Sequence, residues 1–343
     1  MPMRVAVISG DGIGPEVIAE AVKLLDALGG VTLEPLPWSA DHYLATGVTV
    51  PADGYDHLRG CDAVLLGALG DPRVPDNAHA RDILLGTRVA LDLYVNYRPV
   101  RLLEDRLCPL KGRTCADVDF VVFRENTEGL YAGIGGRFQP DTPDEVAIQE
   151  EINTFKGVNR IIRHAFEFAR RHGRRGVCMT DKSNAMTHGH ALWQRVFREV
   201  RADYPGVEAT HLYIDALAML LVQDPGRFDV IVTNNLFGDI ITDIGGALQG
   251  GLGMAASANL HPGRTSMFEP VHGSAPPLAG KNVANPIGAI LSAALMLDTL
   301  GRGDDARRVE RAVEGAVKAG DVTRDVGGTL STTEAGDAIL KRL

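Results

Sequence analysis

The chain has 343 residues, of which 45% are hydrophobic and 23% are charged, a composition typical of a soluble globular protein with room for two domains. Its formal net charge is −9 at pH 7 and it contains no basic tract, which argues against nucleic acid as a partner. No apolar run reaches the length of a membrane span, the cysteines form no Cys-x-x-Cys pair and the N-terminus has no signal-peptide pattern, so we expect a cytoplasmic protein with reduced thiols and no membrane contact.

Short apolar segments alternate with helical patterns along the chain. Residues 4–9 predict a buried strand, and a helix with an early proline, Pro15, follows and ends at Gly29 and Gly30. Further strands, each followed by a polar turn and a helical stretch, are predicted at residues 63–67, 119–124, 176–180 and 228–233. This alternation predicts an α/β fold with a largely parallel sheet.

One segment departs from this alternation. Residues 133–147 are rich in Gly, Pro, Asp and Thr, and residues 145–149 alternate between polar and apolar side chains. The pattern predicts an irregular or β-hairpin excursion, which is either a surface loop or an arm that interlocks with a partner subunit.

The turn at residues 10–14 (GDGIG) imitates a dinucleotide-binding fingerprint. The third fingerprint glycine would fall at Pro15, and the chain near residue 35 offers no acidic residue at a strand end. We therefore predict a tight strand-to-helix turn and a fold that is not a Rossmann fold.

Two acidic residues share a predicted helix face. Asp239 and Asp243 are spaced i, i+4, so their carboxylates lie close together and repel unless a counter-ion is present. A hard divalent cation such as Mg²⁺ or Mn²⁺ prefers such oxygen ligands, and Asp215, after a strand-like segment, is a third candidate. On spacing alone, two solvated helix acids are the simpler interpretation.

Several cationic and hydroxyl side chains stand where predicted elements end. Arg88, Arg98 and Arg124 lie beside apolar residues, and three such arginines suggest a polyanionic small molecule. Lys182 is either a general base or a surface lysine, and Tyr131 is either an acid or a core residue. The loop at residues 269–276 has a composition that suits a nucleotide, although such a loop is weak evidence alone.

A series of motifs resembles the isocitrate/isopropylmalate dehydrogenase family of β-decarboxylating dehydrogenases. They occur in the family's order over nearly the whole chain: GDGIGPE (10–16), NYRP (96–99), RENTEG (124–129), DKSN (181–184), NLFGDIITD (235–243), EPVHGSAP (269–276) and ANP (284–286). Jointly they are highly specific.

The resemblance implies an enzyme that uses NAD and Mg²⁺ or Mn²⁺ to oxidise a malate-type 2-hydroxy acid and remove a carboxyl group from C3. The substrate carboxylates would be bound by Arg88, Arg98 and Arg124, and the metal by Asp215, Asp239 and Asp243. Lys182 and Asp215 would act at the C2 hydroxyl, and Tyr131 would protonate the enol. NAD would contact Glu269, His272, Gly273, Ser274, Ala275 and Asn285.

The resemblance also implies the family's two-domain α/β fold. Residues 1–99 and 251–343 would form a large nucleotide-binding domain, and residues 100–250 a dimerisation and substrate/metal domain with an arm near 128–155. The molecule would be a homodimer with shared active sites, in which Lys182 and Asp215 of one subunit join Asp239 and Asp243 of the other.

Leu84 and Leu85 occupy the region where the family reads the C3 substituent. Two leucines favour an alkyl group, which supports 3-isopropylmalate and a place in leucine biosynthesis, although tartrate/D-malate enzymes also carry two leucines here. Arg81 replaces a glutamate common in isopropylmalate enzymes and would suit an anionic substituent. Pro277-Leu278 lacks the phosphate-binding pair of NADP-dependent members, which favours NAD.

A function of another class stays open at this point. The family includes non-catalytic regulatory subunits, which usually lose catalytic or metal-binding groups. Every such group named above is present in this chain, which favours an enzyme.

Overall fold

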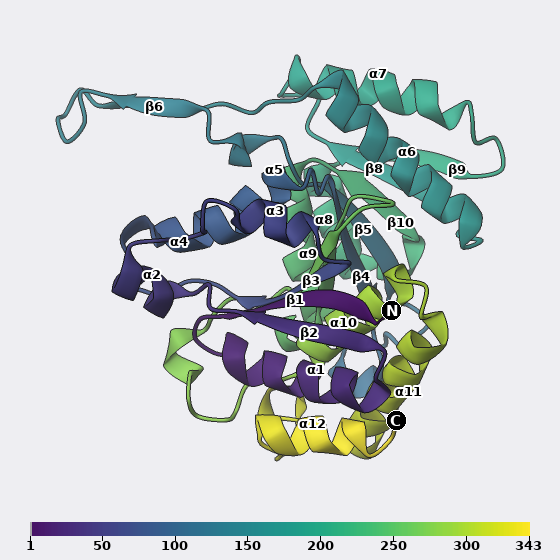
Figure 1. The fold of residues 1–343 in the computed structure, drawn as a ribbon. Coiled ribbons are helices and arrows are strands. Elements are labelled where there is room, and N and C mark those ends of the chain that lie inside the picture. The colour runs from purple at the N-terminus through teal and green to yellow at the C-terminus, as the bar shows by residue number, and fades with distance from the viewer. Residues whose placement is uncertain (1) are drawn as a thin grey trace. The chain divides into compact units, whose positions relative to one another are not determined.

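The computed structural model describes residues 2–343, and the chain divides into two compact units (Figure 1). Unit 1 holds the described residues up to Leu93 together with Arg98–Val118 and Gly246–Leu343, and unit 2 holds Tyr94–Tyr97 and Asp119–Gly245. Strand β4 (Val95–Arg101) contributes residues to both units, and helix α9 (Asn235–Leu248) ends in unit 1.

Unit 1 is built on a mixed sheet whose strands run in the order β2-β1-β3-β12-β11. The pairs β1–β2, β1–β3 and β3–β12 are parallel, and β11–β12 is antiparallel. The strands are β1 Met3–Gly10, β2 Val31–Leu36, β3 Ala63–Ala68, β11 Ala256–Leu260 and β12 Ser266–Pro270. Every residue of β3 is buried, as expected for a parallel strand with both faces covered.

The helices of unit 1 follow from local signals. Helix α1 has Pro15 near its start and ends at Gly29 in a positive-φ conformation, as predicted. Helix α10 is apolar on all sides and packs against α1, α11 and β12 in the core. The helices are α1 Gly14–Leu28, α2 Ala40–Thr46, α3 Gly54–Arg59, α4 Ala78–Ala80, α5 Thr87–Ala90, α10 Ile287–Thr299, α11 Gly303–Ala319 and α12 Thr332–Leu340. Short 3₁₀ turns are η1 Pro75–Asn77, η3 Asp105–Leu107, η6 Leu252–Met254, η7 Pro276–Leu278 and η8 Arg324–Val326.

Unit 2 has a fully parallel sheet in the order β5-β10-β8-β9. Its strands are β5 Asp119–Glu125, β8 Gly176–Asp181, β9 Glu208–Tyr213 and β10 Val230–Thr233. Its helices are α6 Phe155–Arg171, α7 Gly189–Arg201, α8 Ile214–Gln223 and the first part of α9, with 3₁₀ turns η4 Leu130–Ala132 and η5 Pro225–Arg227. The amphipathic helix α6 buries one face against β5, β8, β10 and α7.

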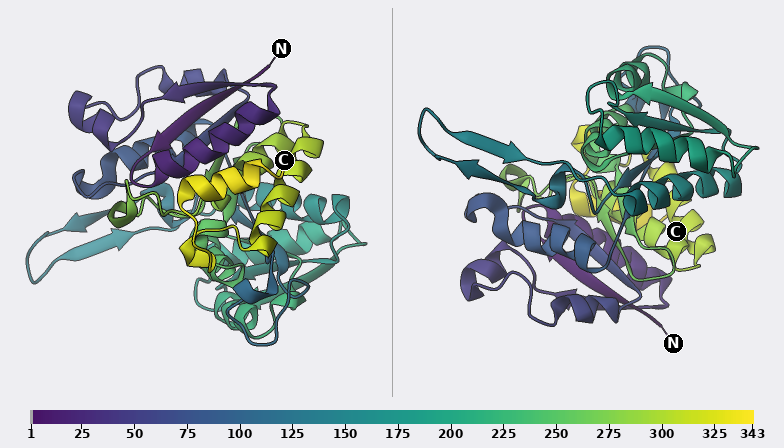
Figure 2. Two further views of the ribbon diagram at one scale, coloured as in Figure 1. Left: turned by 90° about the horizontal axis from the view of Figure 1, so that it is seen from below. Right: turned by 90° about the horizontal axis from the view of Figure 1, so that it is seen from above.

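The excursion predicted at residues 133–149 is a β-hairpin. Strands β6 (Gly135–Phe138) and β7 (Val146–Gln149) pair antiparallel, and Figures 1 and 2 show the ribbon extending away from α6 and α7. All eight of its strand residues are exposed. A two-stranded ribbon without cover is marginal in water, and this one gains no stability from the chain's own core.

The unit boundaries differ from the predicted domain division at residues 94–97, which belong to unit 2, at residues 246–250, which belong to unit 1, and at residues 100–118. Residues 100–118 were expected with the central domain, whereas Arg98–Val118 cluster with unit 1. Arg106 gives a physical reason, because its guanidinium donates to the carbonyls of Val317 and Val326. These bonds join positions more than 200 residues apart, so no local sequence signal reports them.

The turn at residues 10–14 packs against protein backbone. A Cβ on Gly12, which has φ +58°, would lie 2.0 Å from the carbonyl oxygen of Ser274, and one on Gly14 would lie 2.3 Å from that of Ser9. Glycine is therefore required by the packing of the chain on itself, in agreement with the prediction of a tight turn.

Among residues 2–343, none of the helices combines the length and the apolar character that a membrane span requires.

Candidate active site

The carboxyl ends of the parallel strands of unit 2 carry most of the predicted chemistry. Arg124 lies near the end of β5, Lys182 directly follows β8, Asp215 follows β9, and Asn234 and Asn235 follow β10. Parallel strands end at one edge of their sheet, which is where open α/β sheets bind ligands. The fold thus gathers residues from four separate segments of the sequence along one edge.

Arg124 and Asp239 form an ion pair at this edge of the unit 2 sheet. The Arg124 side chain is 2% exposed, and its Nη1 donates to Asp239 while Nε and Nη2 donate to Oδ1 of Asn235 at 2.9 and 2.7 Å. A Cβ on Gly238 would lie 2.6 Å from the Arg124 stem. Glycine in α9 therefore lets this arginine lie flat against the helix. The motif NLFGD thus positions the Arg124 guanidinium as well as the Asp239 carboxylate.

Tyr131 reaches the same carboxylate. Its hydroxyl donates to Oδ2 of Asp239 at 3.0 Å, and its ring centroid lies 5.4 Å from the Arg124 guanidinium. Tyr131 is 41% exposed, which excludes the core-residue interpretation. Asp243 lies one turn after Asp239 on α9 and is exposed, so the two carboxylates share one face as predicted.

Lys182 and Asp215 form a second group. The Lys182 ammonium donates to the Asp215 carboxylate, and this hydrogen bond lowers the pKa of Asp215. The Lys182 ammonium also lies 5.9 Å from the centre of the Tyr213 ring. Within the described chain, the carboxylates of Asp215, Asp239 and Asp243 do not form a cluster of ligand atoms within 4.8 Å of one another.

Unit 1 carries the other two predicted arginines. Arg88 is buried in α5, and its Nη2 donates to Oε1 of Glu269 at 2.9 Å. The same oxygen accepts a hydrogen bond from Asn259 at 2.8 Å, a partner that sequence reasoning missed. Arg98 is buried on β4. Glu269, predicted to contact the cofactor, is thus engaged in orienting Arg88.

Leu84 and Leu85 lie in a π-helix, Arg81–Gly86, between α4 and α5. Leu84 packs against the apolar core cluster of unit 1 around Trp38, Leu58 and Ile83. Leu85 is half-buried and is not part of that cluster. Single π-helical turns are frequent at functional sites. In this turn the two leucines are neighbours in the sequence but differ in their surroundings, because only Leu84 packs on the core cluster.

The loop after β12 contains the predicted cofactor residues. The carbonyl of Ser274 accepts a hydrogen bond from Ile13 at 2.9 Å, and Ala275 adopts the left-handed region with φ 39°. Gly273 is exposed. Asn285 is committed within the protein, because its Oδ1 accepts the Ile287 N–H at 3.0 Å and its amide group donates to Asp325 at 3.0 Å.

His272 is the member of this loop with an unused polar atom. Its Nδ1 lies 3.0 Å from the carbonyl of Gly273 and therefore carries the proton, which leaves Nε2 as an acceptor. Nε2 is buried and has no partner in the described chain. Burial lowers the pKa of His272, so the ring is neutral and suited to accept a hydrogen bond from an amino group of a nucleotide base.

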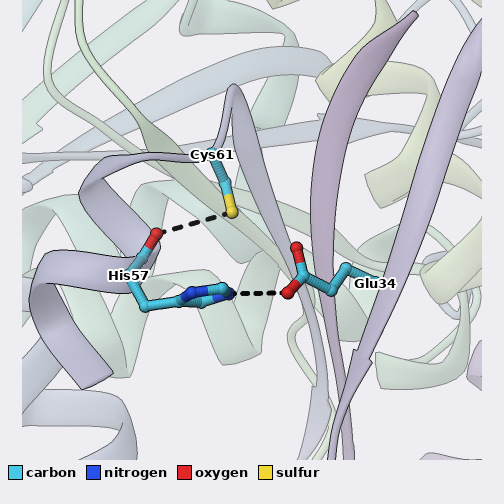
Figure 3. A group of neighbouring side chains, drawn as sticks. All are labelled: Glu34, His57 and Cys61. Carbon is cyan, nitrogen blue, oxygen red and sulfur yellow. Dashed lines mark hydrogen bonds and ion pairs between the residues drawn. The ribbon is translucent and has the colours of Figure 1, made fainter. Parts of the chain in front are cut away.

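A further cluster, Glu34, His57 and Cys61, holds three atoms of metal-ligand type (Figure 3). Glu34 Oε1 lies 2.9 Å from His57 Nε2, Arg4 contacts Oε2 at 3.1 Å, and the Cys61 thiol contacts the His57 carbonyl at 3.6 Å. The adjacent guanidinium opposes a bound cation, and both carboxylate oxygens are occupied. We assign this cluster to an ion-pair network that ties α3 to the edge strand β2.

Comparisons with known proteins point to a single family. The sequence matches the isocitrate/isopropylmalate dehydrogenase family over residues 4–339. It is 50% identical over 344 residues to the 3-isopropylmalate dehydrogenase of Mycobacterium avium, covering 99% of this chain and 100% of that protein. It is 47% identical over 350 residues to that of Thermobifida fusca, covering 99% and 98%. The crystal structure of isocitrate dehydrogenase from Methylococcus capsulatus superposes with a TM-score of 0.91 at 37% identity and covers 99% of both chains. The predicted fold class is confirmed.

Proposed function

The chain belongs to the isocitrate/isopropylmalate dehydrogenase family of decarboxylating dehydrogenases, and on this premise we propose that it converts 3-isopropylmalate to 4-methyl-2-oxopentanoate and CO₂ with NAD and Mg²⁺ or Mn²⁺. The observation that carries the proposal is the group formed by Arg124, Tyr131 and Asp239. It combines a carboxylate-binding cation, a proton donor and a metal-type ligand in mutual contact.

The residues fit both expected groups. Asp239 and Asp243 on one face of α9, and the exposed Asp215, offer the carboxylate oxygens that a hard divalent cation prefers. The buried, unpartnered Nε2 of His272 supports NAD at the loop 272–275. When bound, NAD accepts the hydride from C2 and the cation polarises the C2 carbonyl.

The chain's own residues supply binding and proton transfer. We assign Arg88, Arg98 and Arg124 to the substrate carboxylates, because a guanidinium binds a carboxylate in bidentate fashion. Lys182 would help to deprotonate the C2 hydroxyl, a step that needs its amine in the neutral form. Tyr131, already a hydrogen-bond donor to Asp239, would give a proton to C3 once the carboxyl group has left.

We further propose a homodimer with shared active sites. The hairpin exposes Ile134, Phe138, Val146 and Ile148, an apolar set that a second copy would cover. Lys182 and Asp215 form a pair of their own, and Asp215 does not cluster with Asp239 and Asp243 within one chain. Both features are expected if Lys182 and Asp215 complete the site of the other subunit.

A substrate panel tests the reaction. NADH formation is measured with 3-isopropylmalate, D-malate, tartrate, isocitrate and homoisocitrate, with Mg²⁺ or excess chelator, and with NADP in place of NAD. We expect kcat/KM for 3-isopropylmalate to exceed that for D-malate by about 10- to 100-fold, because an apolar pocket gains roughly 1–3 kcal/mol per added methylene. Equal or better use of D-malate or tartrate would refute the substrate, and full activity in chelator would refute the metal.

Hybrid dimers test the sharing. Lys182→Ala and Arg124→Ala chains, each inactive alone, are co-expressed with different affinity tags so that heterodimers can be isolated. If sites are shared, each heterodimer holds one intact site and regains part of the wild-type activity. Heterodimers without activity would indicate self-contained subunits.

A further inference from the structure

His190 makes a hydrogen bond to the main chain of Lys182. It lies in the first turn of α7, is completely buried, and packs edge-on against Phe237 with ring centroids 5.6 Å apart. Its Nδ1 lies 2.7 Å from the backbone nitrogen of Lys182. A backbone N–H only donates, so Nδ1 is the acceptor and carries no proton. The neutral ring therefore holds its proton on Nε2.

The Nε2 side of the ring faces Glu151. The His190 Nε2 and a Glu151 oxygen are 3.2 Å apart, and Asn234 donates its Nδ2 to Glu151 Oε1 at 2.7 Å. Burial raises the pKa of Glu151, but its contacts with His190, Asn153 and Asn234 together lower it below its ordinary value. Glu151 is thus an ionised acceptor for two donors.

Asn234 links Glu151 to α9 through hydrogen bonds. Its Oδ1 accepts the Phe237 N–H at 2.9 Å and its carbonyl accepts the Gly238 N–H at 3.0 Å, so it caps the helix that bears Asp239 and Asp243. Glu151 therefore joins two elements of unit 2, one through His190 and one through Asn234. The segment that holds Glu151 directly follows the hairpin strand β7.

We propose that Glu151 and His190 are positioning residues that hold the main chain of Lys182 in its reactive place through a neutral, Nε2-protonated imidazole. The proposal rests on the role proposed above for Lys182. A displacement of about 1 Å at a reacting group costs roughly 10²-fold in rate. The loss should fall on kcat, because neither residue is assigned to substrate binding.

Two substitutions of His190 separate positioning from mere packing. In His190→Asn, the amide oxygen takes the place of Nδ1 and can still accept the Lys182 N–H, whereas in His190→Gln the amide lies near the place of Nε2. Gln is closer to His in volume, so a packing role predicts that Gln is tolerated at least as well as Asn. The proposal predicts the opposite order. The kcat should fall only in part for Asn, which keeps the acceptor for Lys182 but loses the contact with Glu151, and about 10²-fold for Gln, at similar KM.

A second readout is independent of turnover. Hydrogen exchange at the Lys182 amide, followed by mass spectrometry on the full-length protein, should be slow in wild type and His190→Asn and fast in His190→Gln. His164→Asn and His164→Gln serve as the matched control, because His164 is also a mostly buried helix histidine but contacts Phe123 instead of Lys182. The two control variants should not differ in either measurement.

The outcomes distinguish this proposal from the proposed function. If the Lys182 amide exchanges equally fast in the Asn and Gln variants of His190, the hydrogen bond from Lys182 to His190 does not protect it and the proposal fails. If the exchange differs but kcat is equal, the hydrogen bond exists but does not matter for the reaction, and the positioning role fails. If wild type turns over no substrate of the panel, the proposed function fails, and the exchange data alone decide whether His190 holds this main chain.

Discussion

Asp11 of the GDGIG turn is a buried carboxylate whose removal should strongly destabilise unit 1. Its Oδ1 accepts the Ala40 N–H at 2.6 Å, and its Oδ2 accepts the Gly70 N–H at 2.8 Å and faces Nε2 of His79 at 2.7 Å. Asp11 is 6% exposed and His79 is fully buried, so water cannot readily replace these bonds. The carboxylate joins the first turn to α2, to the segment after β3 and to α4.

The size of the effect follows from counting donors. In Asp11→Asn, the single amide oxygen cannot serve both faces, so at least one backbone N–H stays unpaired whichever way the amide turns. A buried unpaired donor costs about 1–3 kcal/mol, and the weaker neutral hydrogen bonds add to this. We expect about 2–4 kcal/mol for Asp11→Asn and at least about 4 kcal/mol for Asp11→Ala, which leaves three donors unpaired.

Urea denaturation at one fixed protein concentration measures the loss. Glu16→Gln is the matched control, because Glu16 belongs to the same motif and also accepts two backbone N–H groups, from Gly280 and Asn282, but is only half-buried. Water can replace those bonds, so the control should change the free energy of unfolding by less than about 1 kcal/mol. If Asp11→Asn behaves like Glu16→Gln, the buried network does not contribute as reasoned.

Three further changes test the site and the pH dependence. Tyr131→Phe removes only the hydroxyl that donates to Asp239, and steady-state turnover should fall about 10²–10⁴-fold at similar KM; an unchanged rate would leave this hydroxyl without a role in proton transfer. Burial lowers the pKa of His164 from 6.5 to about 4, so between these pH values the unfolded state binds a proton that the folded state does not. The contribution of His164 to the free energy of unfolding is therefore complete above pH 6.5. It should fall by about 1.4 kcal/mol per pH unit as the pH is lowered towards 4. His164→Leu should flatten that part of the urea-denaturation profile, and a slope that persists would assign it to other groups. Leu85→Arg should lower kcat/KM for 3-isopropylmalate at least about 10-fold and improve homoisocitrate, whereas Leu84→Arg in the core cluster should chiefly lower stability in thermal melts.

The sequence predicts the order of elements in this fold because each carries a local signal. The strands at 4–9, 63–67, 119–124, 176–180 and 228–233 are all present, within a residue or two of their predicted bounds. The π-helix at 81–86 was not predicted, since its residues also fit an ordinary helix. The placement of residues 100–118 with unit 1 was not predicted either, because it depends on bonds from Arg106 to distant carbonyls.

The candidate site residues were chosen by motif, and the contacts that they make in the structure were not predicted. Parallel strands explain why Arg124, Lys182 and α9 meet at one edge, and this much follows from the strand–helix alternation. Glu269, held by Asn259, orients Arg88, and His190 contacts the main chain of Lys182. The neighbouring residues in the sequence carry no signal for either pairing. Only the three-dimensional register of the strands and helices brings these donors and acceptors together.

The ion pairs of unit 2 give a physical reason to expect metal dependence. Arg124 is paired with Asp239 and Lys182 with Asp215, so each cation already has its own carboxylate. A dicarboxylate that bound alone at Arg124 would bring its negative charge next to Asp239, which already pairs with this guanidinium, and the two anions would repel each other. A divalent cation held by the aspartates would cancel this repulsion and leave the arginine available to the substrate. Affinity for 3-isopropylmalate, measured by calorimetry without NAD, should therefore rise with Mg²⁺ concentration in wild type. It should depend less on Mg²⁺ in Asp239→Asn, and an affinity that is equal with and without Mg²⁺ in wild type would show that these ion pairs do not compete with the substrate.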